Sequence, residues 1–210
     1  MCNLYSMTSN QQAIRDLAGA MQDRTGNLAP LPSIYPDQSA PIVQNGADGR
    51  EMVMARWGMP SPAFALAGKK TDRGVTNIRN TASPHWRRWL SPQHRCVVPW
   101  TSFSEMARQE DGTFEPVWFA ADDDRPLRFF AGLHTTWTSV RKIREGEITA
   151  DLFGFLTTEA NDIVRPYHPK AMPVVLETAD EVDVWLDAPW DVARTLQRPL
   201  RDAALTVVQA

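Results

Sequence analysis

The sequence predicts an α+β fold, on three observations. Short apolar runs of strand-like composition alternate with polar, Gly-, Asp- or Pro-rich segments along the middle of the chain. Helical periodicity is confined to the two ends. With 210 residues, the chain is long enough for one substantial core and too short for two full domains. We therefore expect a single domain over residues 1–210, built around a curved antiparallel sheet with flanking helices.

The first element expected is a helix from Asn10 to Arg24. Its apolar residues fall on one face at helical spacing: Ile14, Leu17, Ala18 and Met21. The passage after it, LAPLPSIYPDQSAP (residues 28–41), is rich in proline, so we expect it to be irregular.

Short strands are expected next, along the middle of the chain. The runs are MVMARW (52–57), CVVPW (96–100), PVWFA (116–120), RFFAGLH (128–134), DLFGFLTT (151–158) and MPVVL (172–176). Two short helices follow, in residues 178–189 and 189–199, with Thr178 and Pro189 near their starts. LTVVQA (205–210) is expected to form a last strand.

Composition excludes several classes of protein. A net charge of −3 gives no overall signal for nucleic acid or membrane binding. Two cysteines are too few for a disulfide framework, which fits a reducing cytosol. The N-terminal residues lack the apolar segment of a signal peptide, and no apolar run reaches membrane-spanning length. We expect a cytoplasmic monomer that does not bind membranes.

The four histidines have no metal-ligand spacing, and no CxxC pair is present. We therefore expect no metal and no other cofactor. Cys96 lies in an apolar strand-like run and is expected to be a small buried hydrophobic residue.

One segment, residues 69–95, is locally basic, with seven Lys or Arg residues against one acid, Asp72. Trp86 and Trp89 lie within it. Cations interleaved with aromatic residues suit single-stranded nucleic acid, because phosphates need cations and bases need stacking surfaces. The alternative is a solvated basic face above two core tryptophans.

Cys2 is the most unusual position in the chain. If Met1 is removed, residue 2 carries a thiol and a free α-amine on adjacent carbons. The amine has a reference pKa of about 7.7–8.0, so part of it is neutral near physiological pH and can attack an aldehyde. The thiol can then close onto the imine carbon as a five-membered thiazolidine ring, or it can act alone as a peptidase nucleophile. The structural alternative is an idle terminal residue.

Other residues suggest chemistry more weakly. His168 lies between two prolines before an apolar run, where it can transfer protons or merely cap a turn. Glu105 follows the strand-like run 96–100, although most glutamates are solvated and inert. Asn77 and Arg79 alternate, so on an extended segment they face the same way. The arginine suits a phosphate.

These residues belong to motifs that occur together in one order. They are Met1-Cys2, Trp57-Gly58, Asn77-Ile78-Arg79, VPWTSFSEM (98–106) and LTTEANDIVRPYHPKAMPVVL (156–176). In this order and with cysteine at position 2, the chain resembles the SRAP (SOS response-associated peptidase) family, also called abasic-site processing proteins. The resemblance runs along most of the chain and implies an α+β fold on a barrel-like sheet.

The resemblance also implies an activity and its residues. Such proteins bind single-stranded DNA that contains an abasic site and cross-link to it through the N-terminal cysteine; several also show lyase activity. Carried over to this sequence, the catalytic set is Cys2, Asn77, Glu105 and His168. The DNA-binding set is Arg79 and Thr157, to which we add Lys170, Arg73, Trp86 and Phe64 as further expected contacts.

Three departures from the family pattern affect expected DNA contacts. Asn3-Leu4 replaces the usual Gly-Arg after the cysteine, which removes one phosphate contact. The Asn-x-Arg motif continues as Asn80-Thr81, without the usual Glu. The segment from His168 to Pro173 is one residue longer than usual, and Lys170 stands where an arginine charge is expected. We expect the chemistry to persist and the details of DNA affinity to differ.

Two other functions stay open from the residues alone. In a cysteine peptidase, His168 would activate the Cys2 thiol and Glu105 would orient the histidine; its substrate would include the leader residue itself. A non-covalent single-stranded DNA-binding module would need no reaction at Cys2.

Overall fold

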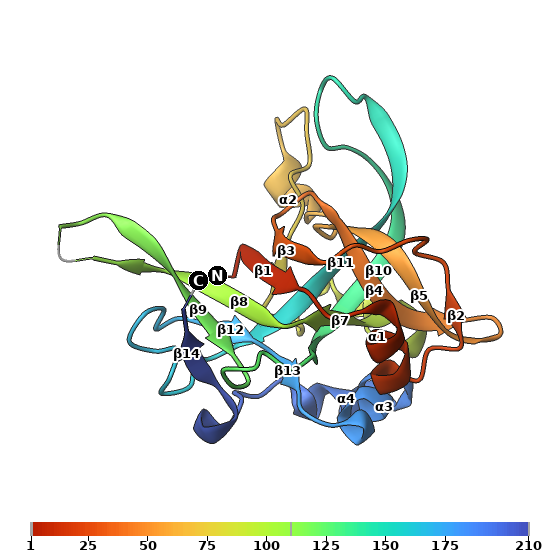
Figure 1. Ribbon diagram of the computed structural model, residues 1–210. Helices are drawn as coiled ribbons and strands as arrows, with labels where there is room; N and C mark the ends of the chain where they lie inside the picture. Colours follow the sequence, from red (N-terminus) through yellow and green to blue (C-terminus); the bar gives the residue numbers. More distant parts are fainter. Residues whose placement is uncertain (1, 110, 210) are drawn as a thin grey trace.

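The computed structural model describes residues 2–109 and 111–209. Its centre is a closed β-barrel, visible in Figure 1 behind the N-terminal strand. Neighbours around the ring are β11, β10, β7, β4 and β5, with β5 returning to β11. The bounds are β4 (Ser39–Gly46), β5 (Gly49–Trp57), β7 (Arg95–Trp100), β10 (Arg128–Val140) and β11 (Glu147–Thr158).

Pairing between β11 and β5 closes the barrel. All other contacts around the ring are antiparallel, but this one is parallel, with Leu152 opposite Arg56 and Phe153 opposite Trp57. The β4–β5 hairpin turns between Gly46 and Gly49, and Gly49 has a φ of 111° that a residue with a Cβ adopts only under strain. The sheet is therefore mixed and curved back on itself.

Aromatic packing fills the barrel. Tyr5 is fully buried and lies edge-on to Trp57, Phe130 and Phe155, at ring-centroid distances of 5.2, 6.0 and 6.1 Å. Edge-to-face contacts in this range stabilise beyond the burial of area alone. Because Tyr5 is only three residues after Cys2, the same packing anchors the N-terminus.

A second sheet covers one side of the barrel. Its strand order is β14-β9-β8-β1-β3, and the β8–β9 hairpin extends away from the body in Figure 1. The bounds are β1 (Leu4–Met7), β3 (Leu31–Ile34), β8 (Ser102–Arg108), β9 (Phe114–Ala120) and β14 (Thr206–Val208). Short strands β2 (Gln22–Asp23), β6 (Asn77–Ile78), β12 (Met172–Pro173) and β13 (Val175–Leu176) extend the barrel sheet.

Helices lie outside the barrel. α1 (Gln11–Ala18), α3 (Ala179–Asp187) and α4 (Trp190–Ala193) gather at one end in Figure 1, and α2 (Ala63–Leu66) lies in a projecting loop. Short 3₁₀ turns are η1 (Arg87–Trp89), η2 (Pro92–His94), η3 (Arg194–Leu196) and η4 (Asp202–Ala204). Trp185 of α3 donates its indole N–H to the carbonyl of Cys96 at 2.9 Å, which ties this helix to β7.

Most of the predicted elements are confirmed, including the helix after Thr178, whose hydroxyl accepts from the amide of Glu181. The first helix was predicted too long. It ends at Ala18 because Gly19 adopts the left-handed conformation at φ 64° and caps it; Gln22 and Asp23 then pair with β5.

The prediction that residues 28–41 are irregular is also wrong in part. They contain β3 and the start of β4. Pro32 is compatible with β3 because this strand lies at the edge of its sheet. In the last predicted strand, Ala210 lies outside the described residues. No helix in the described part of the chain is long and apolar enough to cross a membrane.

Candidate active site

Cys2 is held inside the protein by the strand that follows it. β1 lies between β8 and β3, with Leu4 opposite Ser104 and Tyr5 opposite Phe103. Cys2 has no exposed surface, and its thiol donates to the carbonyl oxygen of Leu4 at 3.5 Å. The alternative of an idle terminal residue is therefore not observed at Cys2. Met1, whose removal the chemistry requires, lies outside the described residues.

Asn77 contacts Cys2 directly. It lies on β6, which pairs in parallel with β11, so Asn77 is opposite Phe155. Its Nδ2 donates to the carbonyl oxygen of Cys2 and to Oγ1 of Thr76, both at 2.9 Å. Its Oδ1 is buried and accepts no hydrogen bond from the described residues. The amide therefore fixes the main chain of Cys2 and has acceptor capacity left.

Glu105 is the carboxylate of the site. It lies on β8, is 2% exposed, and burial raises its pKa above the usual value for glutamate. The pKa of the Cys2 thiol is also raised, mainly by burial and second by the negative charge of Glu105. A raised thiol pKa favours the protonated thiol at neutral pH.

His168 completes the cluster. Its Nδ1 lies 4.0 Å from Oε2 of Glu105 and 2.8 Å from the carbonyl oxygen of Ala171. A carbonyl oxygen only accepts, so Nδ1 carries the hydrogen, and in a neutral ring Nε2 is then the basic nitrogen. The structure thus brings together the predicted set of Cys2, Asn77, Glu105 and His168.

Arg79 and Lys170 lie beside this cluster. Arg79 donates to the carbonyl oxygen of Lys170 at 3.2 Å and lies 3.5 Å from the carboxylate of Glu159. Both Arg79 and Lys170 are exposed. Arg79 therefore supports the loop that carries His168 and still presents charge to solvent.

Gln197 is a residue that sequence reasoning missed. From the end of η3, its Nε2 donates to the carbonyl oxygens of Arg79 at 2.8 Å and Thr157 at 3.0 Å. Its Oε1 accepts from the hydroxyl of Thr81 at 2.9 Å. Thr157 itself is 2% exposed. No local sequence signal marks Gln197, because its partners are between 40 and 118 positions away along the chain.

A cleft of about 550 Å³ runs next to Cys2 on the other face of β8. Ser104 and Met106 line this cleft, whereas Glu105 between them points the opposite way, because successive residues of a strand alternate. The remaining lining residues are Asn3, Leu4, Tyr35, Pro36, Arg73, Gly74, Thr76 and Pro116. Arg73 is therefore a residue of the cleft rather than of the Glu105–His168 cluster.

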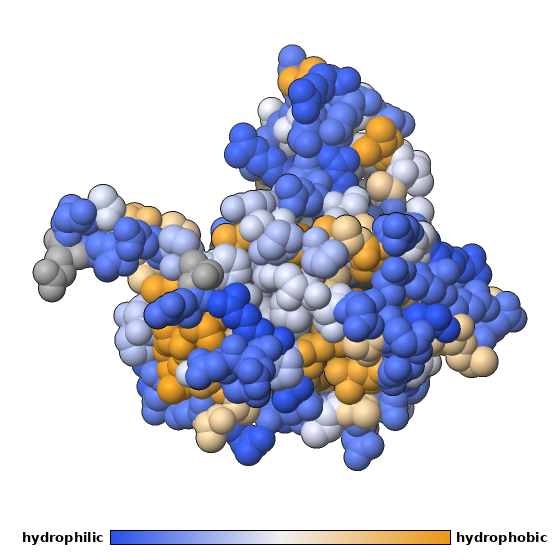
Figure 2. All heavy atoms as spheres, viewed as in Figure 1, coloured by the Kyte–Doolittle hydropathy of each residue, from blue (hydrophilic) through white to orange (hydrophobic). Residues whose placement is uncertain are grey.

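Phe64 lies on the projecting loop around α2. Phe64 is 84% exposed. Figure 2 shows that this upper projection is mostly hydrophilic, with a few apolar side chains on it. An exposed aromatic ring on such a projection is available to a partner.

The basic segment does not form one continuous face. Trp86 is 7% exposed and packs against His85 and Trp89, so no broad ring face is open for stacking. Arg95 has no exposed surface, lies over Trp185 at 5.6 Å and donates to the carbonyl oxygen of Ala188. The structure therefore favours core tryptophans in this segment, because apolar neighbours bury them.

The remaining candidates take no part in the cluster. Cys96 is fully buried, as expected. Within residues 2–109 and 111–209, no group of three or more His, Cys, Asp or Glu side chains is arranged to hold a metal ion.

Fold and site together define a single-barrel protein in which an asparagine holds the main chain of Cys2 and a buried carboxylate beside the thiol lies 4.0 Å from a histidine. The sequence model of the SOS response associated peptidase (SRAP) family matches residues 1–210. The chain therefore belongs to this family, and the resemblance drawn from its motifs is confirmed.

Solved structures show the same fold at low identity. A protein from Bordetella bronchiseptica is 23% identical with a TM-score of 0.74, and the match covers 100% of both chains. One from Bacteroides thetaiotaomicron is 20% identical with a TM-score of 0.77, covering 99% of this chain and 92% of the other. A phage-related protein from Bordetella bronchiseptica is 18% identical with a TM-score of 0.70, covering 100% and 95%. No curated protein matches the chain.

Proposed function

We propose that this protein captures abasic sites in single-stranded DNA as a covalent thiazolidine on Cys2, after Met1 is removed. The observation that carries the proposal is the set of interactions made by Cys2. Asn77 donates a hydrogen bond to its carbonyl oxygen at 2.9 Å, and the charge of Glu105 acts on its thiol. His168 stands 4.0 Å from Glu105. Once Met1 is removed, the aminothiol of Cys2 would lie beside Glu105, which has His168 as its neighbour.

The reaction balances without a cofactor. The neutral α-amine of Cys2 attacks the aldehyde carbon of the ring-opened sugar, and the carbinolamine loses water to give an imine. The thiol sulfur then bonds to the imine carbon while its proton passes to the nitrogen. The products are a thiazolidine and one water molecule. Glu105 and His168 would carry these protons.

The raised pKa of the Cys2 thiol favours this chemistry over a peptidase. A peptidase needs a thiolate to attack an unactivated amide, and a buried thiol beside a carboxylate disfavours the thiolate. An imine is a stronger electrophile, and the thiol proton is needed on its nitrogen. The same imine acidifies the neighbouring C2′–H, so proton removal by Glu105 or His168 would break the C3′–O bond and give lyase activity.

Exposed side chains around the cluster would position the strand. Arg73 lines the cleft that also contains Asn3 and Thr76, the chain neighbours of Cys2 and Asn77. Arg79 and Lys170 present charge on the His168 side. Phosphate contacts of this kind fix register without reading sequence. We propose that the protein acts as a cytoplasmic monomer on the strand.

A denaturing gel tests the proposal. The protein with Met1 removed is incubated with a labelled single-stranded oligonucleotide carrying an abasic site, a tetrahydrofuran analogue that lacks the aldehyde, or an intact base. We expect a heat-stable shifted band only with the true abasic site. Cys2→Ser should abolish the band, and Cys96→Ser, the matched control, should leave it.

The rival functions give different results. A non-covalent binder gives no band that survives denaturation. A cysteine peptidase loses hydrolysis in Cys2→Ser but tolerates an acetylated α-amine, whereas thiazolidine formation requires that amine. Absence of a cross-link with the processed protein would overturn the proposal.

A further inference from the structure

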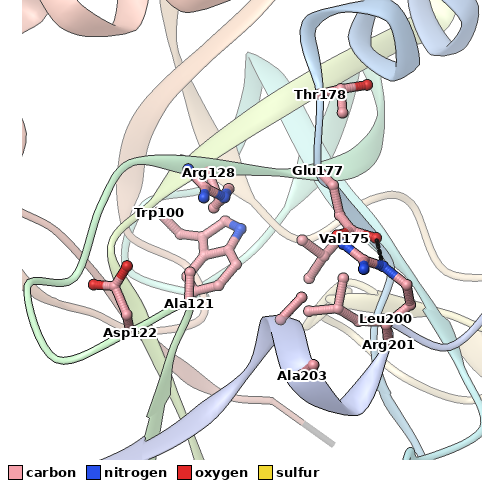
Figure 3. Close-up of a pocket in the computed structure, with 11 residues that line it drawn as sticks. Trp100, Ala121, Asp122, Arg128, Val175, Glu177, Thr178, Leu200, Arg201 and Ala203 are labelled. Atoms are coloured by element: carbon pink, nitrogen blue, oxygen red, sulfur yellow. Dashed lines mark hydrogen bonds and ion pairs between the residues drawn. The ribbon is translucent and has the colours of Figure 1, made fainter.

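A second cavity lies apart from the cysteine site. Its volume is about 430 Å³, and it lies between the ends of β7, β10 and β13 and the C-terminal segment around η4 (Figure 3). Its lining includes Trp100, Asp122, Arg128, Glu177, Leu200 and Arg201. The candidate catalytic residues do not line it, so it has no role in the chemistry proposed above.

A hydrogen-bond donor without an acceptor among the described residues lies just beneath the floor of this cavity. Trp100 has no exposed surface, and its ring stacks on Phe130 at 4.8 Å with an interplanar angle of 7°. Its indole N–H is buried and finds no acceptor among the described residues. Figure 3 shows the indole nitrogen turned toward the side of the pocket where Glu177 and Arg201 lie. A buried donor without an acceptor costs about 1–3 kcal/mol, which an acceptor on a ligand would recover.

A cation stands beside that donor. Arg128 is directly opposite Trp100 in the β7–β10 pairing, so both side chains lie on the same face of the sheet. One guanidinium nitrogen donates to the carbonyl oxygen of Leu127 at 3.0 Å. The ion pairs within residues 2–109 and 111–209 do not include Arg128.

The acidic groups lie at the edges. Glu177 accepts from Arg201 at 2.5 Å, so this pair is close to neutral. Asp122 is exposed, on the side opposite that pair in Figure 3. Positive charge and an N–H donor are therefore concentrated at the floor, and one uncompensated negative charge stands at the mouth.

We propose that this cavity binds a small molecule through an oxyanion, a carboxylate or a phosphate group. The guanidinium of Arg128 pairs with the group, and a small shift of the side chains that cover Trp100 lets one anionic oxygen accept from its indole N–H. A volume in this range holds more than an inorganic ion, so the anion is a head group of a larger molecule seated against Val175 and Leu200.

Nitrogen-15 NMR of the intact protein tests the proposal through the assigned indole N–H signal of Trp100. The probes are acetate, inorganic phosphate, thymidine 5′-monophosphate and uncharged thymidine, each at constant ionic strength. We expect a saturable shift of the Trp100 signal with at least one anion and none with thymidine. Acetate and phosphate separately report carboxylate and phosphate selectivity, and tighter binding of the nucleotide than of phosphate identifies a nucleotide pocket.

Four variants sharpen the test. Arg128→Gln should weaken anion binding about tenfold, whereas Arg87→Gln, at an exposed arginine elsewhere, should leave it unchanged. Asp122→Asn should tighten binding, because it removes the negative charge at the mouth. Cys2→Ser should have no effect, which separates this site from the proposed DNA chemistry. No shift with any anion, or equal shifts in the Arg128→Gln protein, would overturn the inference.

Discussion

At the residue scale, the site depends on an amide that holds the main chain of Cys2. A side chain that holds the backbone carbonyl of Cys2 helps to orient the α-amine, which is bonded to the α-carbon, and the thiol, which is bonded to the neighbouring β-carbon. Asn77 does so from β6, while Glu105 and His168 approach from other elements. Positioning of this kind contributes to rate because the reacting atoms need not be ordered at each turnover.

Asn77→Ala should slow cross-linking at least tenfold. It removes the donor to the Cys2 carbonyl, and leaving that buried acceptor unmet should also lower the free energy of unfolding by about 1–3 kcal/mol. The measurements are the single-turnover cross-linking rate and a urea titration. Asn80→Ala, at an exposed asparagine three residues further on, is the control and should change neither. Cross-linking at the normal rate in Asn77→Ala would show that the hydrogen bond from Asn77 to the Cys2 carbonyl oxygen is not needed.

Glu105→Gln tests the buried carboxyl. Burial raises its folded pKa above the unfolded value of about 4.3. The folded state therefore holds the proton more tightly, and the stabilising contribution present at lower pH is lost as pH rises through the folded pKa. We expect Glu105→Gln to be more stable than the parent protein at pH 8 and similar at pH 4, by urea titration.

The same variant should be a poor catalyst. Loss of a general acid–base group typically slows a reaction by about 10²–10⁴-fold, so cross-linking at pH 7 should fall in that range. A variant that gains stability at pH 8 and keeps the full rate would leave Glu105 with a structural role only.

At the scale of elements, the site is assembled by segments far apart in the chain. Local patterns predicted the strands well, because alternating composition and flanking turns are local properties. They failed at Gly19, where a single left-handed cap stops a periodic pattern, and at residues 28–41, where pairing partners override proline. Gln197 was missed for the same reason: only the folded chain brings it to Arg79 and Thr157.

Motif order predicted the site better than any single residue did. Cys2, Asn77, Glu105 and His168 are each weak signals alone. In the structure, Asn77 contacts Cys2 from β6, Glu105 lies on β8, and His168 approaches Glu105 from the loop before β12. For Trp86, prediction from the sequence was less successful. Its position in a basic segment suggested a surface on which bases could stack. In the structure Trp86 is buried by neighbours such as Trp89, and composition alone does not show which residues will pack together.

Gln197→Ala tests how elements are joined. The side-chain amide of Gln197 joins Arg79, just after β6, to Thr157, near the end of β11. Arg79 in turn contacts the loop that carries His168, so loss of this amide should make that side of the site less rigid. We expect cross-linking to slow about threefold to tenfold, with a stability loss of about 1–2 kcal/mol. Gln197→Glu should be slow as well, because a carboxylate cannot donate hydrogen bonds to the carbonyl oxygens of Arg79 and Thr157. Gln93→Ala, at an exposed glutamine, is the control.

At the scale of the whole molecule, the position of the N-terminal site depends on the packing of the barrel that supports it. Tyr5 inserts into the aromatic core, and β10 and β7 must approach closely as neighbours in the ring. Gly132 permits part of this approach. A Cβ built there would lie 2.8 Å from Sγ of Cys96 and 3.1 Å from Cγ2 of Val98. Its role is therefore steric, at the contact between β10 and β7.

Gly132→Ala should lower the free energy of unfolding by about 1–3 kcal/mol through overpacking. Because Cys96 makes the shortest contact, adding Cys96→Ala should recover part of that loss, and the double-mutant cycle should show a favourable coupling energy. Chemical unfolding followed by far-ultraviolet circular dichroism and tryptophan fluorescence measures each variant, and coincident transitions would show the barrel unfolding as one unit. Purely additive effects would locate the strain elsewhere than at Cys96.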